Sequence, residues 1–520
     1  MNSLRSAPLA SLASLGWVAA LLVAACGGGK TQAAGPSSGW IKGLDGKKGS
    51  KAAEGTVVAV GDVPPDVSGI TGRTLKLASK ARQLKVKEPI KLQVLGAQQL
   101  VAVVRKKVGD DIPKDLVRAE GNTYAALGLI PPTYKYEEET YALLEEELAG
   151  LYIPEDKTMY VAAGITGADL ESTLAHELVH ALQDQHFGIG ERMKFRPGQG
   201  DAIAAIHALA EGDATSAMFD ARIISEHGEE AVKMKNATAI PDQDPEDLLA
   251  ITLKDKAGKS RISAAPRFLA VGLLAPYADG MRFVHAMRRQ GGPLGWRAVD
   301  QAWARPPIST EQLLHIDKYA ANELPIEVPA ATSNALGASF KKTYDDVFGE
   351  QEGRIAFAEW MDVKSSKKAA AGWGGDRVTL FEHGDKRAVS WRIVFDSRDE
   401  SDEAYGLLAF GWAKSFGPPS LQLPVNEKGE QLQVWGAVPQ PAAPKEPPPD
   451  PKAKKPAKGD KGKPESTLPP LPPLPDAPGA PAVKMDGCRA LRQAGKSVTI
   501  LGGVPCGSVV AWAAEVGKLP

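Results

Sequence analysis

Apolar side chains recur at helical spacing between Gly167 and Gln183, and this pattern predicts an amphipathic helix. No Gly or Pro follows its first residue, and Thr166 with Asp169 resembles a capping box at its start. At about 100° per residue, His176 and His180 lie within roughly 40° of each other. The leucines of this segment fall on the opposite side: Leu170, Leu174, Leu178 and Leu182. One face should therefore pack into a core while the other presents two imidazoles.

Shorter patterns predict a hairpin before this helix and a second helix after it. Strand-like residues 150–153 and 158–162 flank a Pro-Glu-Asp turn, which is typical of a hairpin. A helix is expected from Asp201 to about Ile224. Further strand and helix patterns follow beyond residue 331, at 377–382, 388–395, 402–415, 497–501 and 508–516.

The composition changes along the chain and divides it into regions. Residues 26–60 are rich in Gly, Ser, Ala and Lys, which indicates a flexible tether. Residues 438–484 are dominated by Pro and Lys and cannot bury enough apolar surface to fold, so an extended insertion is expected. Because strand-then-helix patterns lie on both sides of it, 331–437 and 485–520 should form one small α/β unit. The expected fold class is α+β, with a mainly helical domain at 61–330 that carries a small edge hairpin.

Residues 1–25 have the features of a bacterial signal peptide. Arg5 precedes an almost wholly apolar run from Leu15 to Ala25, shorter than the about 20 residues that span a bilayer. The Val23-Ala24-Ala25-Cys26 sequence resembles the lipobox of bacterial lipoproteins, in which the cysteine is lipidated and becomes the new N-terminus. We therefore expect Cys26 to anchor the chain to a bacterial membrane, in the cell envelope and facing the periplasm or exterior. An ordinary secretory signal with an incidental cysteine is the alternative.

Cysteine usage and charge bear on the compartment and the partners. An exported compartment would allow Cys488 and Cys506 to form a disulfide, and two free thiols are the alternative. The 62 Lys and Arg residues nearly balance the 63 Asp and Glu residues, for a net charge of -1. This balance provides no basic field, so nucleic acid is not an expected partner. We expect the chain to be a monomer.

The HELVH segment carries the candidate chemistry. Two histidines one helical turn apart, His176 and His180, can bind a single zinc ion. The intervening Glu177 can then act as general base toward a zinc-activated water. A catalytic zinc site of this kind needs a third protein ligand.

Two residues are candidates for the third ligand. His186 stands where the metzincin pattern HExxHxxGxxH places it, but Gln183 replaces the glycine at which that chain turns away. If the helix continues, His186 points about 120° away from His180. Glu211 is favoured, because on its helix it shares a face with the small residues Ala204, Ala208 and Thr215. A carboxylate on such an interface is costly unless paired, and zinc would pair it. A surface glutamate in an Ala-rich helix is the alternative.

HELVH followed by a glutamate on a second helix resembles the gluzincins, the thermolysin-type zinc metallopeptidases. The segments HELVHALQDQHF, ALAEGDAT and PPISTEQLLHIDKY are also similar to poorly characterised bacterial envelope proteins predicted to be such peptidases, over about residues 80–330. The resemblance implies a zincin-like core, one Zn²⁺ held by His176, His180 and Glu211, Glu177 as base, and hydrolysis of a peptide or protein substrate. The hairpin suits the edge strand along which metallopeptidases lay substrate.

One departure from the family leaves the partner of a zinc-binding histidine unassigned. The acidic residue often found four positions after the ligand glutamate is replaced by Thr215, so Asp213 and Asp184 are the candidates for that role.

The sequence does not decide which residues donate hydrogen bonds to the transition state. Tyr277, His315 and Tyr319 are the available residue types downstream, and His207 could line the cleft. The alternative to an enzyme is a non-catalytic envelope lipoprotein with a structural metal site, which binds a cell-wall polymer or a protein partner.

Overall fold

A computed structural model describes residues 57–255, 260–292, 295–438 and 487–517. The predicted signal peptide, the lipidation candidate Cys26, nearly all of the tether and nearly all of the Pro/Lys-rich insertion lie outside the described residues. The fold is mixed α+β, as the sequence predicts.

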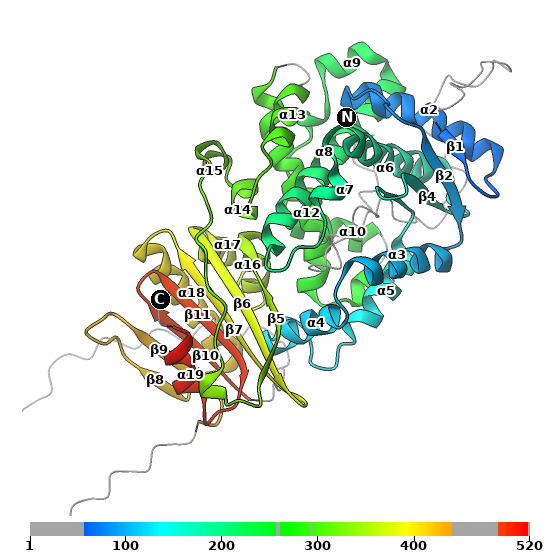
Figure 1. Ribbon diagram of the computed structural model, residues 1–520. Coiled ribbons are helices and arrows are strands. Elements are labelled where there is room, and N and C mark those ends of the chain that lie inside the picture. Colours follow the sequence, from blue (N-terminus) through cyan, green and yellow to red (C-terminus); the bar gives the residue numbers. More distant parts are fainter. Residues whose placement is uncertain (1–56, 256–259, 293–294, 439–486, 518–520) are drawn as a thin grey trace, which may run out of the picture.

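The first part of the chain surrounds a four-stranded sheet with helices (Figure 1). The sheet order is β1 (Val57–Ala59), β2 (Ile90–Leu95), β4 (Thr158–Ala162), β3 (Gly150–Ile153). β3 and β4 pair antiparallel, which confirms the predicted hairpin, and β3 lies at the edge of the sheet. The helices before residue 200 are α2 (Pro65–Arg82), α3 (Ala97–Asp111), α4 (Leu116–Leu127), α5 (Tyr136–Glu147), α6 (Gly167–Phe187) and α7 (Ile189–Arg192).

The predicted motif helix is confirmed as α6 and continues beyond Gln183 to Phe187. Its four leucines are buried, at most 3% exposed, as the spacing indicates. The predicted capping box was wrong, because the Thr166 side chain makes no capping hydrogen bond. The helix ends where Gly188 adopts a φ of 64°, in the left-handed region that glycine tolerates best.

A long helix after this one carries the segment with Glu211. The predicted helix at 201–224 is confirmed as α8 (Gly200–His227). The remaining helices of this part are α9 (Glu229–Met234), α10 (Pro245–Asp255), α11 (Arg261–Ala264), α12 (Arg267–Gln290), α13 (Trp296–Ala304), α14 (Thr310–Leu314) and α15 (Ile316–Ala321).

The helices α8 and α12 cross with almost no space between their backbones. A Cβ atom on Gly280 of α12 would lie 1.8 Å from the Ala208 carbonyl oxygen, and one on Gly212 of α8 would lie 2.0 Å from the Gly280 carbonyl carbon. Only glycine fits at either position, since real Cβ atoms do not approach other atoms so closely. The small residues near Glu211 thus allow the close helix packing that the sequence indicates.

The second part of the chain is built on a seven-stranded antiparallel sheet. Its strand order is β5 (Lys341–Asp346), β6 (Trp373–His383), β7 (Lys386–Phe395), β11 (Ser497–Val504), β10 (Cys488–Ala494), β9 (Gln431–Trp435), β8 (Leu421–Leu423). β11 pairs with β7, so strands from both sides of residues 439–486 belong to one sheet. The predicted segments beyond residue 331 lie, to within one residue, inside β6, β7, α18 (Arg398–Phe416), β11 and α19 (Val509–Val516). The remaining α-helices of this part are α16 (Gly349–Phe357) and α17 (Val363–Ala370).

One helix from the first part packs on this second sheet. α4 contacts β5, β6, β7 and β11, and its carbonyl oxygen at Ala126 lies so close to Gly502 that a Cβ there would be 2.1 Å away. Tyr124 of α4 and Trp391 of β7 belong to the same hydrophobic core. A single core therefore crosses the boundary that the sequence analysis expects near residue 330, between the helical domain and the α/β unit.

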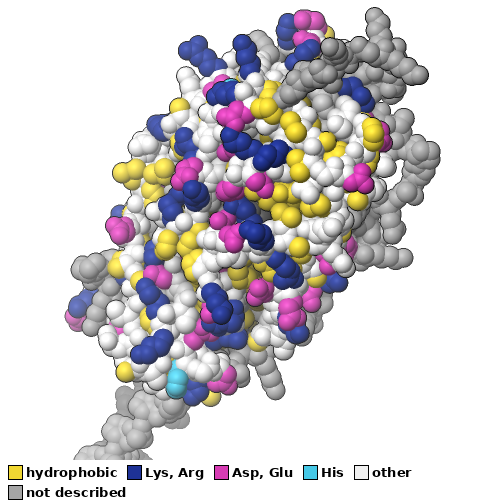
Figure 2. Space-filling model, turned by 45° about the vertical axis from the view of Figure 1, so that its right-hand side comes forward, with side chains coloured by type: hydrophobic (Ala, Val, Ile, Leu, Met, Phe, Trp, Pro, Cys, Tyr) yellow, Lys and Arg dark blue, Asp and Glu magenta, His cyan; other side chains and the backbone are white. Residues whose placement is uncertain are grey.

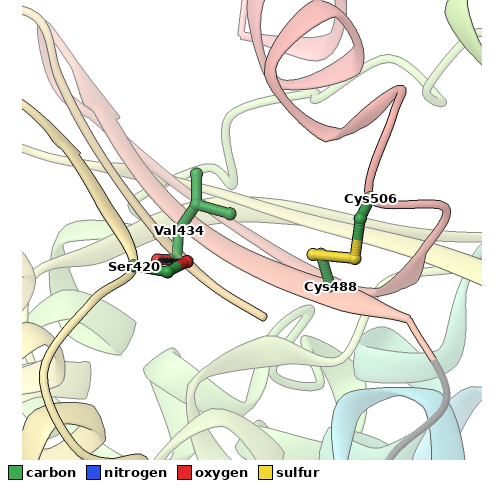
Figure 3. The surroundings of a disulfide bond; sticks show 4 residues. All are labelled: Ser420, Val434, Cys488 and Cys506. Carbon is green, nitrogen blue, oxygen red and sulfur yellow. Dashed lines mark hydrogen bonds between the residues drawn. A yellow bond between two sulfur atoms is a disulfide. The ribbon is translucent and has the colours of Figure 1, made fainter. Parts of the chain in front are cut away.

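A disulfide joins Cys488, at the start of β10, to Cys506, between β11 and α19 (Figure 3). Nearby, the Ser420 backbone N–H and hydroxyl donate to the Val434 carbonyl at 2.8 and 3.0 Å, which holds the chain before β8 against β9.

The surface has no large field of one sign on the face drawn in Figure 2, where Lys and Arg side chains are interspersed with Asp and Glu. None of the helices in the described part of the chain combines the length and the apolar character that crossing a membrane requires.

Replacing Gly280 with alanine should force α8 and α12 apart, because the new Cβ meets the Ala208 backbone. We expect Gly280→Ala to lower the free energy of unfolding by about 1–3 kcal/mol, measured by urea denaturation. The control is Gly406→Ala in α18, where a Cβ meets nothing within 4 Å. That change should instead stabilise by about 0.4–1 kcal/mol. Equal effects of the two changes would contradict the role given to the crossing.

Candidate metal centre

His176 and His180 on α6 meet Glu211 on α8 at one point inside the protein. The two imidazole Nε2 atoms lie 3.0 Å apart. Glu211 Oε2 is 2.9 Å from His176 Nε2, and Glu211 Oε1 is 3.4 Å from His180 Nε2. The three side chains are buried, at most 3% exposed. The structure therefore brings the three predicted ligands together, with Glu211 rather than His186 in the third position.

The donor set fits a zinc ion. Ligand atoms held at about 2.0–2.2 Å by a tetrahedral zinc lie roughly 3.3–3.6 Å from one another, close to the observed separations. Glu211 Oε1 is buried and has no hydrogen-bond partner among the described residues, so one carboxylate oxygen is available to a cation. Two imidazole nitrogens and a carboxylate are ligands that zinc prefers.

The charges of the three residues are coupled. Burial alone would raise the pKa of Glu211, but His180 and His176 outweigh it and hold that pKa well below its usual range. Burial opposes the protonation of His180, yet Glu211 raises the pKa of His180 to about 9. Burial lowers the pKa of His176, and Glu211 offsets only part of this effect. Glu211 is thus an anion that needs a positive partner, which a protonated His180 or a bound cation would supply.

Glu177 lies between the two histidines on α6 and is fully buried. The Tyr152 backbone N–H, on the edge strand β3, donates to Glu177 Oε2 at 2.9 Å. Glu177 Oε1 is buried and makes no hydrogen bond within the described chain. Burial raises the pKa of Glu177 to about 8. One oxygen is therefore held by the sheet edge while the other remains available to a reacting group.

Gln183 lies directly behind His180, and this role is not among those predicted from the sequence. Its Oε1 lies 2.9 Å from His180 Nδ1, and its Nε2 donates to the Ala210 carbonyl on α8 at 3.0 Å. The side chain is fully buried. Its position three residues after His180, on the same side of the helix, was the signal that could have identified it.

The two predicted partners of a zinc-binding histidine were wrong. Asp213 accepts from Arg82 Nε and, at 2.7 Å, from Trp303 Nε1, so it joins α8 to α2 and α13. Asp184 accepts from the Tyr152 hydroxyl and from the Gly190 N–H, both at 3.2 Å. Each carboxylate is engaged by donors on neighbouring elements, and neither is the partner of His176 or His180.

Of the predicted transition-state donors, only Tyr277 lies beside the three ligands. Its ring centroid is 6.0 Å from that of His176, because the close crossing of α8 and α12 brings α12 over the site. His315 Nε2 is 2.9 Å from Glu350 on α16 instead. The Tyr319 hydroxyl donates to the Arg305 carbonyl at 2.8 Å.

Two further histidines, His207 and His186, lie on the helices that carry the three candidate ligands. His207, one turn before Glu211, places its Nε2 3.5 Å from Glu211 Oε1. This nitrogen is buried and, in the part of the chain described, has no hydrogen-bond partner. His186 Nε2 lies 2.7 Å from the Lys85 carbonyl, at the end of α6, so it faces away from the other two histidines as expected.

A second cluster of carboxylates is occupied by a lysine. Glu311, Glu323 and Asp396 bring oxygen atoms close together. Lys318 Nζ lies among them, 2.5 Å from Glu311 and Asp396 and 3.2 Å from Glu323. The ammonium group therefore takes the place that a cation would need, and this cluster is an ion-pair network.

The comparisons with known proteins bear on the second part of the chain alone. A family described as a domain of unknown function (DUF8575) matches residues 338–415, from just before β5 to near the end of α18. None of the three candidate ligands lies within that segment. No curated protein and no solved structure matches the chain.

Separate substitutions of Glu211 and His186 should show which of them binds zinc as the third ligand. Glu211→Gln removes the charged oxygen, and we expect it to lower zinc affinity by more than about 100-fold, since even outer partners of metal ligands contribute about 10- to 100-fold. His186→Gln should leave the affinity unchanged, because His186 contacts the Lys85 carbonyl. Competition with a chromophoric chelator measures both. Release of zinc by His186→Gln with retention by Glu211→Gln would reverse the assignment.

Proposed function

We propose that this protein is a zinc-dependent metallopeptidase of the gluzincin type, tethered to a bacterial membrane in the cell envelope. The observation that carries the proposal is the convergence of His176, His180 and Glu211, with Glu177 on the same helix. A structural site has no need of a base between its ligands, whereas hydrolysis does.

His176, His180 and Glu211 would hold the ion. When bound, zinc supplies Lewis acidity, which lowers the pKa of water and polarises a carbonyl oxygen. Glu177 Oε1, which makes no hydrogen bond within the described chain, would accept a proton from the attacking water and pass it to the leaving amine. The Tyr152 N–H would keep Glu177 in place by holding its other oxygen.

Tyr277 and His207 are the side chains placed to assist. Tyr277 contacts His176 and His207 lies beside Glu211, and the Tyr277 hydroxyl and the His207 ring can each donate a hydrogen bond to a substrate carbonyl. The edge strand β3 lies beside α6 and has one side unpaired in the sheet, as strands that bind extended peptides do. Because Glu177 and Glu211 are fully buried, a peptide reaches them only after the surrounding elements open.

The proposed location follows from the N-terminal sequence and agrees with the disulfide. We place a lipid on Cys26, which would tether the chain and leave its folded part facing the periplasm or the exterior. The Cys488–Cys506 disulfide suits such an oxidising compartment. The substrate class is a peptide or protein.

The second candidate function is a non-catalytic envelope lipoprotein in which the metal fastens α6 to α8. The burial of the three residues favours it, because a catalytic metal keeps one coordination position open for water or substrate, which must be able to reach the ion. Its C-terminal unit would then bind a cell-wall polymer or a protein partner.

Glu177→Gln distinguishes the two candidates. The full chain should bind about one zinc, and the variant should keep it, because Glu177 is not a ligand. Cleavage of a casein or peptide-library substrate should fall by about 100-fold or more, as expected for loss of a general base. His176→Ala is the control that loses both zinc and cleavage. Cleavage that persists in Glu177→Gln would remove Glu177 from its role, and a zinc-loaded wild type without any cleavage would favour the structural candidate.

A further inference from the structure

Gln183 connects the two helices that supply the metal ligands. It lies one turn after His180 on α6, and its amide reaches Ala210, the residue before Glu211 on α8. Both ends of the amide are used, at 2.9 Å to His180 Nδ1 and 3.0 Å to the Ala210 carbonyl. The side chain is fully buried, so bulk solvent does not reach these contacts.

The Ala210 carbonyl decides which way the amide points. A carbonyl oxygen can only accept a hydrogen bond, so the amide nitrogen Nε2 of Gln183 must face it. The amide oxygen Oε1 then faces His180 Nδ1 and must accept from it. Nδ1 therefore carries a proton, and in the neutral ring this leaves the lone pair on Nε2. His180 Nε2 faces His176 Nε2 and Glu211, so in the neutral ring this lone pair is directed to the point where the candidate ligands converge.

We propose that Gln183 is a positioning residue, which holds His180 in the tautomer and ring orientation that bind a metal through Nε2. The proposal rests on the metal site of the proposed function. Histidines that bind metals usually donate their other N–H to such a partner, and this fixes the ring and increases its basicity. Gln183 does so while also tying the ring to the turn of α8 that carries Glu211.

The rival explanation is that Gln183 only satisfies buried polar groups between two packed helices. Under that explanation its loss should destabilise the protein but leave the metal affinity of the folded protein alone. The two explanations therefore differ in what they predict for zinc affinity.

Two substitutions separate the two contacts of the amide. Gln183→Leu has a similar shape and removes both hydrogen bonds. Gln183→Glu keeps an oxygen that accepts from His180 Nδ1, but it replaces the donor to Ala210 with a second carboxylate oxygen and adds a negative charge. The zinc dissociation constant of each full chain is measured by competition with a chelator, and urea unfolding of the metal-free proteins reports stability.

Gln185 provides a matched control on the same helix. Its Oε1 accepts from the Lys87 N–H at 2.8 Å and its Nε2 donates to the Glu88 carbonyl at 2.9 Å, so it also makes a contact at each end. Those contacts hold the loop before β2 and do not involve a ligand. Gln185→Leu should alter stability without altering zinc affinity.

We expect Gln183→Leu to weaken zinc binding by about 10- to 100-fold, and Gln183→Glu to retain affinity close to that of the wild type. Unchanged affinity in Gln183→Leu would overturn the proposal. So would an equal loss in Gln183→Glu, because the contact to Ala210 would then be the one that matters. If the wild type itself binds no zinc, and His176→Ala behaves identically, the proposed function fails, which is a separate result.

Discussion

The structure around the site depends on keeping one carboxylate paired. Glu211 is fully buried on the face of α8 that meets α6, where an unpaired charge would cost several kcal/mol. The imidazoles of His176 and His180 meet that need in the metal-free protein, and zinc would meet it when bound. These contacts require a fixed distance between α6 and α8. The geometry of the site therefore depends on how the two helices pack.

The neighbouring helices maintain this packing in two ways. Small residues allow close approach, and buried polar groups form hydrogen bonds between helices. Gly212 and Gly280 let α12 approach α8 to backbone contact, which carries Tyr277 to the site. Asp213, in the next turn, is held by Arg82 and Trp303, so α8 is fastened on the side away from the ligands. Polar partners on neighbouring helices thus allow an Ala-rich helix to carry buried charged residues.

The sequence predicted the local parts of this arrangement and missed those that depend on distant contacts. Residue spacing predicts the helix with His176 and His180 and the hairpin before it, because helical and strand geometry convert spacing into position. The small residues that share a helix face with Glu211 predict that Glu211 lies at a helix interface. His315 was misplaced because its partner, Glu350, lies in α16, and no local pattern indicates that contact. The strand order of the second sheet is likewise non-local, since β11 enters beside β7 after a long intervening segment.

The presence of Gln183, where the metzincin pattern has a glycine, accounts for Glu211 rather than His186 meeting the two histidines. In the metzincin pattern a glycine at this position lets the chain turn, so that a third histidine returns to the metal. Here the residue is a good helix former, and α6 continues to Phe187, which carries His186 away to the Lys85 carbonyl. The same side chain fills the space behind His180 and contacts α8 at Ala210. A helix that continues in this way leaves the third position to a neighbouring element, and the contact at Ala210 sets α8 in register to present Glu211 there.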